Sequence, residues 1–178
     1  MNTPNVVCDP KMVNSTPVFR LAGRVAPYAR MKILVIDDEP ANVALLEEIL
    51  REDGYSRVTT LVDSRDALET CDRIQPDLIL LDLMMPNVDG FTILETLRSH
   101  PTDVFLPVLV LTADVNEQTK RRALASGATD FLVKPIDPTE AVLRITNLLE
   151  IRRLNMQLDM QRAAVEEALR VRNESNHH

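Results

Sequence analysis

The sequence has few of the residues on which several kinds of ligand site depend. Its 178 residues include four glycines, two cysteines and no tryptophan, and aromatic residues make up 3%. The glycines are scattered, which excludes the glycine-rich loops that bind dinucleotides or nucleotide phosphates. Cys8 and Cys71 lie far apart and fit no metal-binding or disulfide spacing. We therefore expect free thiols in a reducing cytoplasm.

Basic charge is also in short supply, which argues against nucleic-acid binding. The formal net charge is −7, whereas phosphate backbones attract basic surfaces. Base stacking is disfavoured as well, because so few aromatic residues are present. No apolar run approaches the roughly 18 residues of a membrane-spanning helix. The sequence thus predicts a cytoplasmic protein with no direct nucleic-acid binding and no membrane insertion.

Residues 1–30 differ in composition from the rest of the chain. They contain four prolines, show no sustained apolar period, and carry four basic residues against one acidic residue. We interpret this segment as a flexible leader outside the fold. A secretory signal peptide is disfavoured because charged residues, Gly23 and Pro27 interrupt its apolar part. A basic transit peptide and an overextended start, with Met31 as the natural first residue, are the two alternatives.

From Met31 onward, short apolar strands alternate with amphipathic helices. This alternation predicts a doubly wound α/β fold, in which helices cover both faces of a parallel sheet through right-handed crossovers. We expect five strands in the flavodoxin-like order 2-1-3-4-5, in a domain spanning residues 31–150. The strands are expected at 32–36, 58–62, 78–81, 108–112 and 130–133, and the helices at 40–54, 64–73, 91–99, 114–127 and 138–173.

Three of the helix starts carry candidate capping residues. Ser64 is expected to cap the second helix. Asp114 with Glu117, and Asp137 with Glu140, have the spacing of a capping box. These side chains should accept hydrogen bonds from backbone amides in the first turns of their helices.

Polar residues stand at the ends of the predicted strands. Four apolar residues from Leu78 form a strand buried on both faces, and Asp82 follows at its carboxyl end, where open parallel sheets bind ligands. Asp37 and Asp38 follow the first strand, Thr112 the fourth and Lys134 the fifth. Side chains from five distant positions are therefore expected at one edge of the sheet.

The chemistry of this set indicates phosphoryl transfer. Because the first and third strands are neighbours in the expected order, Asp37, Asp38 and Asp82 should converge, and three close carboxylates repel unless a positive group lies among them. A hard divalent cation such as Mg²⁺ suits such oxygen ligands. Lys134 adds a second positive charge and Thr112 a hydroxyl donor. A carboxylate nucleophile with these partners is suited to phosphoryl transfer.

Taken together, these motifs resemble the receiver domain of two-component response regulators. The resemblance covers about residues 31–150 and lies in the acidic pair Asp37-Asp38, in Asp82 within Asp-Leu-Met-Met-Pro-Asn-Val-Asp-Gly, in Thr112-Ala113 and in Lys134-Pro135. A single piece would be weak, since an aspartate at a strand end is more often a cap or turn residue. All of them occur in the expected register.

The resemblance implies a role for each of these residues. Asp82 would accept a phosphoryl group from a sensor histidine kinase, a phosphotransfer protein or a small acyl phosphate. Asp38, Asp82 and the backbone carbonyl of Met84 would bind Mg²⁺ directly, and Asp37 would bind it mainly through water. Lys134 would pair with a phosphoryl oxygen. The protein would then be a signalling phospho-acceptor that catalyses its own phosphorylation and dephosphorylation, rather than an enzyme with a separate substrate.

The resemblance also implies a conformational switch. Thr112 would turn toward the phosphoryl group, and an aromatic side chain on the fifth strand, here Phe131, would fill the vacated space. Phe131 lacks the hydroxyl of the tyrosine that is frequent at this position, so its burial should depend on packing alone. The Lys134-Pro135 peptide is expected to be cis, which would direct the lysine into the site.

The last predicted helix is longer than the sheet that it would cover. About 36 residues without glycine or a further proline would reach about 50 Å. Residues 151–178 are interpreted as a helical extension with a frayed end. We expect the extension to form either a coiled-coil homodimer, parallel or antiparallel, or a solvated signalling helix joined to a missing part. Its apolar residues at a and d spacing are Ile151, Leu154, Leu158, Val165 and Ala168, interrupted by Gln161 and Arg172. A homodimer through the receiver face is the other arrangement left open.

Two other functions fit parts of the pattern. A receiver-like scaffold that binds partners without phosphorylation would be expected to have lost acids, threonine or lysine, all of which are present. A phosphatase similar to the haloacid dehalogenases needs a second aspartate two residues after the nucleophile, where Met84 stands. The favoured interpretation is a stand-alone receiver without direct transcriptional output; the receiver part of a larger regulator is the alternative.

Overall fold

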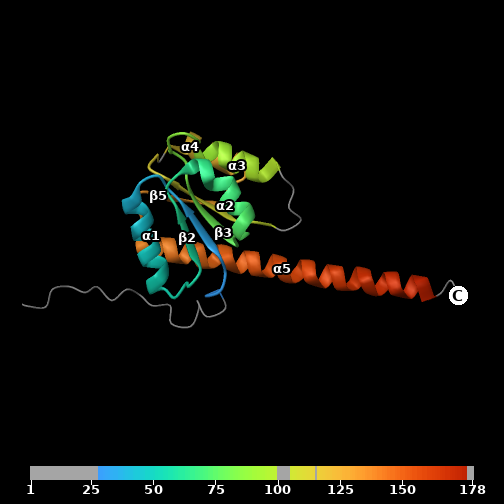
Figure 1. Ribbon diagram of the computed structural model, residues 1–178. Coiled ribbons are helices and arrows are strands. Elements are labelled where there is room, and N and C mark those ends of the chain that lie inside the picture. Colours follow the sequence, from blue (N-terminus) through green and yellow to red (C-terminus); the bar gives the residue numbers. More distant parts are fainter. Residues whose placement is uncertain (1–27, 100–104, 115, 176–178) are drawn as a thin grey trace, which may run out of the picture.

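A five-stranded parallel sheet in the order β2-β1-β3-β4-β5 forms the centre of the protein (Figure 1). The computed structural model describes residues 28–99, 105–114 and 116–175, and the side chains as far as residue 172. The predicted doubly wound α/β fold and its strand order are confirmed. The elements are β1 (Ile33–Ile36), α1 (Pro40–Glu52), β2 (Val58–Leu61), the 3₁₀ helix η1 (Ser64–Asp66), α2 (Ala67–Ile74), β3 (Leu78–Asp82), α3 (Gly90–Ser99), β4 (Val108–Thr112), α4 (Glu117–Ala125), β5 (Asp130–Val133) and α5 (Pro138–Ser175).

The sheet separates two hydrophobic clusters. Side chains alternate between the faces of a strand, so Ile33 and Val35 of β1 pack with α1 and the first part of α5. Leu34 and Ile36 of the same strand pack with α2, α3 and α4 on the other face. Because β1, β3 and β4 are buried on both faces, their apolar residues form continuous runs rather than an alternating pattern.

The register of the sheet brings the ends of the strands to one edge. Ile36 of β1 pairs with Leu81 of β3, so Asp37 and Asp82 follow at the same level. Thr112 of β4 pairs with Val133 of β5, which places Lys134 directly after that level. We call the edge formed by Asp37, Asp38, Asp82, Thr112 and Lys134 the carboxyl edge.

Two of the predicted helix caps are wrong. Asp63, not Ser64, caps η1, by accepting a hydrogen bond from the Arg65 amide at 3.0 Å. Asn116, not Asp114, caps α4, by accepting from the Gln118 amide at 2.9 Å. In place of a cap, the Ser64 hydroxyl bonds to the loop after β3. Asp114 accepts from the Asn116 amide at 2.8 Å and from the Thr119 hydroxyl at 2.6 Å, so it stays within the same turn.

The third predicted cap is present at the start of α5. Asp137 Oδ1 accepts a hydrogen bond from the Glu140 amide at 2.8 Å. Pro138 stands at the first helical position, where its missing N–H leaves no bond unmade. The chain therefore turns directly from the end of β5 into the long helix.

The predicted leader, residues 1–30, lies largely outside the described residues, and the interpretations of residues 1–27 stay predictions. Two of its last three residues, Tyr28 and Ala29, contact the fold. The Tyr28 hydroxyl donates to Glu150 Oε2 at 2.6 Å, and the Ala29 carbonyl accepts from the Ser56 amide at 3.2 Å. Tyr28 also packs against the cluster under α1 and α5. In the described part of the chain, Tyr28 and Ala29 thus contact the domain, and the predicted boundary at Met31 stays a prediction.

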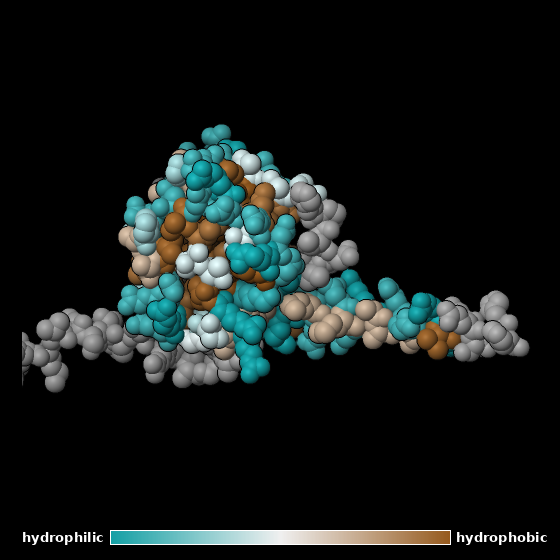
Figure 2. Space-filling view, viewed as in Figure 1, coloured by the Kyte–Doolittle hydropathy of each residue, from teal (hydrophilic) through white to brown (hydrophobic). Residues whose placement is uncertain are grey.

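Helix α5 has a packed part and a projecting part (Figure 1). Ala141, Ile145, Leu148 and Leu149 are buried against the sheet. Arg152 still contacts the domain, through Asp77 at 3.5 Å and the Phe105 carbonyl at 2.7 Å. Farther along, the helix projects from the domain, and Figure 2 shows apolar side chains among polar ones along it. Of the helices in the described part of the chain, none combines the length and the apolar character that a bilayer crossing requires. We call the exposed residues Ile151, Leu154, Leu158, Val165 and Ala168 the distal stripe.

Candidate functional site

Three carboxylates meet at the carboxyl edge, as the sequence predicted. Asp37, Asp38 and Asp82 each offer an oxygen, and these oxygens all lie within 4.8 Å of one another. Asp37 is 0% exposed and Asp82 4% exposed, while Asp38 is half-buried. Charged groups are rarely buried to this extent without partners, so the contacts of these carboxylates decide what the site can do.

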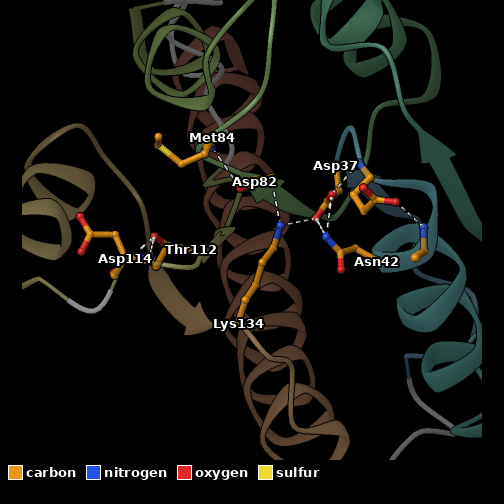
Figure 3. Close-up of polar contacts among 9 residues, drawn as sticks. Asp37, Asn42, Asp82, Met84, Thr112, Asp114 and Lys134 are labelled. Atoms are coloured by element: carbon orange, nitrogen blue, oxygen red, sulfur yellow. Dashed lines mark hydrogen bonds and ion pairs between the residues drawn. The ribbon is translucent and has the colours of Figure 1, made fainter.

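Asp37 is bonded on both of its carboxylate oxygens (Figure 3). Oδ1 accepts from the Glu39 amide at 3.0 Å. The Asn42 Nδ2 group donates to Oδ1 at 3.1 Å and to Oδ2 at 3.2 Å. Lys134 Nζ lies 2.7 Å from Oδ2. The carboxylate is therefore held by one backbone amide, one side-chain amide and one ammonium group.

Lys134 joins the two buried carboxylates. Its Nζ lies 2.7 Å from Oδ2 of Asp37 and 2.7 Å from Oδ2 of Asp82. Burial alone would lower the pKa of the ammonium, but the hydrogen bonds to Asp37 and Asp82 more than offset it, so the pKa is raised above its ordinary value. The Lys134-Pro135 peptide is cis, as the resemblance implied. Lys134 is thus a charged lysine in contact with both acids.

Asp82 is held from the loop that follows β3. The Met84 amide donates to Asp82 Oδ1 at 3.1 Å, while the Met84 side chain is 69% exposed. The same loop returns to β3 at Gly90, whose amide donates to the Leu83 carbonyl at 3.0 Å. A Cβ at Gly90 would lie 2.7 Å from Leu83 Cα and even nearer to the Asp82 carbonyl oxygen. Only glycine allows this close approach, which fixes the loop around Asp82.

Ser64 holds the middle of this loop. Its hydroxyl donates to the Pro86 carbonyl at 2.9 Å and accepts from the Val88 amide at 3.1 Å. Between these two residues, Asn87 has a φ of 70°, a left-handed conformation that asparagine tolerates better than most residues. The hydroxyl expected to cap a helix instead connects η1 to the loop beside the site.

Thr112 and Phe131 lie at the far side of the carboxyl edge. The Thr112 hydroxyl accepts from the Asp114 amide at 3.0 Å, within the turn after β4. The Phe131 ring lies between two cations, with Lys120 Nζ 4.8 Å and the Arg144 guanidinium carbon 5.9 Å from its centroid. Cations attract the face of an aromatic ring, so these contacts stabilise Phe131 in a half-buried position.

The donor set fits a hard divalent cation. The candidate ligands that lie together are oxygens of Asp37, Asp38 and Asp82, and Mg²⁺ prefers oxygen ligands and is commonly bound through one or two carboxylates. The Met84 carbonyl stays a predicted ligand. The buried negative charge of Asp37 and Asp82 exceeds the single positive charge of Lys134. A cation at this place would therefore complete the charge balance of the site.

The sequence analysis missed two side chains of this region, Asn42 and Ser64. The position of Asn42 could have been found from the sequence, because it falls in the first turn of the helix that starts at Pro40, directly after the acidic pair. The contacts of Ser64 could not, since its partners lie more than twenty residues away along the chain.

Comparisons with known proteins agree with this geometry. Residues 33–146 match the family described as the response regulator receiver domain. The response regulator PleD of Caulobacter vibrioides is 41% identical over 133 residues, which cover 75% of this chain and 29% of PleD. The DNA-binding transcriptional regulator RpaA of Synechocystis sp. is 43% identical over 118 residues, which cover 66% of this chain and 48% of RpaA. The chain thus spans less than half the length of these two curated relatives.

A solved structure extends the likeness to three dimensions. The chemotaxis protein CheY4 of Vibrio cholerae matches with a TM-score of 0.62 and 30% sequence identity. The match covers 67% of this chain and 98% of CheY4. It accounts for the sheet and its helices.

Proposed function

The chain belongs to the response regulator receiver domain family, and from this premise we propose that Asp82 accepts a phosphoryl group from a sensor histidine kinase or a phosphotransfer protein. One observation carries the proposal: the buried Asp82 carboxylate contacts Lys134 and lies beside Asp37 and Asp38. The site thus combines a nucleophile, a counter-charge and oxygen ligands for a cation, the parts that phosphoryl transfer requires. Such a donor would be met in the cytoplasm.

The transfer forms one bond to phosphorus and breaks another. A carboxylate oxygen of Asp82 attacks the phosphorus atom, and the bond from phosphorus to the donor imidazole nitrogen or acyl oxygen breaks. The electron pair of that bond leaves with the donor. Asp38, Asp82 and the Met84 carbonyl would hold Mg²⁺ directly, and Asp37 would hold it through water. When bound, the cation would neutralise charge on the phosphoryl oxygens.

Lys134 has a second task in this proposal. Its ammonium group, which lies between Asp37 and Asp82, would turn to a phosphoryl oxygen once Asp82 is modified. Thr112 would give up its contact with the Asp114 amide and donate its hydroxyl to the phosphoryl group. Phe131 would then move inward from between Lys120 and Arg144. Phosphorylation would in this way change the surface around β5.

The output that we propose is a change in association through α5. Four residues of the distal stripe, Ile151, Leu154, Leu158 and Val165, are between 42% and 59% exposed. They recur at the spacing of coiled-coil a and d positions, and their burial requires a second surface. We propose that a second copy of the helix covers them in a homodimer. The direction in which phosphorylation shifts this dimer is the quantity to measure.

Intact-mass measurement tests the central step. Incubation of the full chain with Mg²⁺ and acetyl phosphate should add one phosphoryl group, and Asp82→Asn should abolish the addition. Asp66→Asn, at an exposed aspartate of η1, is the matched control and should be phosphorylated normally. An unchanged wild-type mass, or full labelling of Asp82→Asn, would contradict the proposal and leave a non-phosphorylated scaffold as the better interpretation.

A further inference from the structure

Asn42 is bonded to Asp37 at the carboxyl edge, but the proposed function gives this residue no role. Its Nδ2 group lies 3.1 Å from Oδ1 and 3.2 Å from Oδ2 of Asp37, so one amide reaches both oxygens of a carboxylate that is 0% exposed (Figure 3). The two oxygens of one carboxylate lie too close together to be bonded by separate hydrogens of one NH2 group, so a single N–H is shared between them in a three-centre bond. This contact restrains the orientation of the Asp37 carboxylate as well as its distance from α1.

The backbone of Asn42 is anchored in the core. It stands in the first turn of α1, after Pro40 at the start of the helix, and its amide donates to the Glu39 carbonyl at 3.0 Å. Val43 and Leu46 on the same helix are buried beneath it. The side-chain amide thus reaches Asp37 from a packed helix, which limits how far the carboxylate can turn.

In the proposed function, some bonds to Asp37 persist after phosphorylation and one does not. Lys134 is the partner of Asp37 that carries a charge, and it moves to the phosphoryl group. The bonds from Asn42 and from the Glu39 amide do not depend on that movement. When Lys134 leaves, these two donors are what keeps the Asp37 carboxylate from rotating.

We propose that Asn42 is a positioning residue, which holds Asp37 in the orientation that the cation site needs while Lys134 is exchanged; this inference rests on the proposed function. Groups that orient metal-binding carboxylates affect metal affinity, commonly by tenfold or more. The neutral amide suits this task. A lysine or arginine would bring a positive charge that competes with the cation, and an aspartate could not donate to Asp37.

The test is the affinity of the full chain for Mg²⁺, measured by isothermal titration calorimetry without a phosphoryl donor. Asn42→Leu keeps the approximate size of the side chain but removes both hydrogens. It should weaken Mg²⁺ binding about tenfold. Ala44→Leu places the same residue on the exposed side of the same helix and should bind Mg²⁺ as the wild type does. Unchanged or tighter binding by Asn42→Leu overturns the inference.

A second comparison separates positioning from general damage to the fold. In a Lys134→Met background, the remaining donors to Asp37 are those from Asn42 and Glu39, so Asn42→Leu should weaken Mg²⁺ binding more than it does in the wild type. An equal loss of Mg²⁺ affinity in both backgrounds would contradict the proposal that Asn42 holds Asp37 when Lys134 moves away. If Asn42→Leu does not fold, Asn42→Ser takes its place. The shorter serine side chain keeps a polar group but does not reach Asp37 as asparagine does, so Mg²⁺ binding should again be weaker.

The inference and the proposed function fail in different ways. Wild-type protein that takes up a phosphoryl group on Asp82, with an Asn42→Leu variant that binds Mg²⁺ equally well, sinks the inference alone. Wild-type protein that binds no Mg²⁺ and takes up no phosphoryl group sinks both.

Discussion

The carboxyl edge and the distal stripe both depart from the usual pattern of buried apolar and exposed charged side chains. The carboxyl edge buries charged groups, and the distal stripe exposes apolar ones. At the carboxyl edge, the charged groups of Asp37 and Asp82 are buried and bonded to Lys134 within the chain. On the distal stripe, Leu154 and Leu158 are exposed and about half accessible to solvent. The charged groups of the carboxyl edge find most of their partners within one molecule, whereas the apolar side chains of the distal stripe can be buried only against another surface. Substitutions at the two regions should therefore change different measurable properties.

The largest effect on stability is expected from Lys134→Met. The substitution leaves Asp37 and Asp82 buried without their counter-charge, and removal of one partner from a buried charge pair commonly costs about 3 kcal/mol. We expect a loss of that size in urea unfolding in the presence of EDTA. Saturating Mg²⁺ should restore part of it, because a cation that binds the folded state stabilises it.

Arg51→Met is the control for this prediction. Arg51 pairs with Glu47 at 2.6 Å on the surface of α1, and its side chain is exposed. Exposed ion pairs contribute little, so this variant should unfold as the wild type does. Equal losses in Lys134→Met and Arg51→Met, or no response of Lys134→Met to Mg²⁺, would contradict the account of the carboxyl edge.

Substitutions on the distal stripe should act on association and not on folding. Each leucine buried in a dimer contributes about 1.5–3 kcal/mol. Leu154→Glu together with Leu158→Glu should therefore weaken the dimer at least about a hundredfold by sedimentation equilibrium. Met160→Glu is the matched control, because Met160 is exposed on the same part of the helix but lies outside the stripe. A wild-type chain that stays monomeric at every concentration would remove the dimer from the proposal.

The sequence was sufficient for the sheet because its strands are continuous apolar runs that end in polar residues. Alternation with helices predicts a doubly wound parallel sheet, and the flavodoxin-like order, which was expected for it, brings Asp37 next to Asp82. The two capping errors, at Ser64 and Asp114, occurred where neighbouring polar residues offer the same local signal. At Ser64, the deciding contacts come from a loop more than twenty residues away. Asp114 and Asn116 each accept from the amide two residues further on, so the local pattern does not rank them.

The buried hydroxyl of Ser64 should have a smaller effect than Lys134. Ser64→Ala removes the bonds to the Pro86 carbonyl and the Val88 amide in the loop beside Asp82. The Val88 amide keeps its own bond to the Pro86 carbonyl at 2.9 Å, so neither group is left without a partner. The free energy of unfolding should fall by about 0.5–1.5 kcal/mol, as for a typical lost hydrogen bond. Ser56→Ala is the control, because the Ser56 hydroxyl also donates to a carbonyl, that of Ala29, but is exposed. An equal effect of the two variants in urea unfolding would show that burial of Ser64 does not matter.

The smallest effect on stability at neutral pH is expected from the ionisation of Tyr55. This residue is buried but belongs neither to the carboxyl edge nor to the distal stripe. Its hydroxyl lies 3.1 Å from Thr146 Oγ1 of α5, and burial raises the pKa of Tyr55 to about 12. The folded state then holds the phenolic proton more tightly than the unfolded state, so this contribution is complete below pH 10 and is lost as the pH rises toward 12. The loss should reach about 1.4 kcal/mol at pH 11, one pH unit above the ordinary pKa, since one pKa unit corresponds to about 1.4 kcal/mol.

Tyr55→Phe should flatten the fall in stability between pH 10 and pH 12, as measured by urea unfolding at each pH. It should not remove the fall completely, because burial also raises the pKa of the Cys71 thiol, to about 11. The Tyr55→Phe and Cys71→Ala double variant should be flatter still. A fall between pH 10 and pH 12 that stays as steep in the double variant as in the wild type would assign it to other groups, such as Tyr28, whose pKa is raised by its hydrogen bond to Glu150.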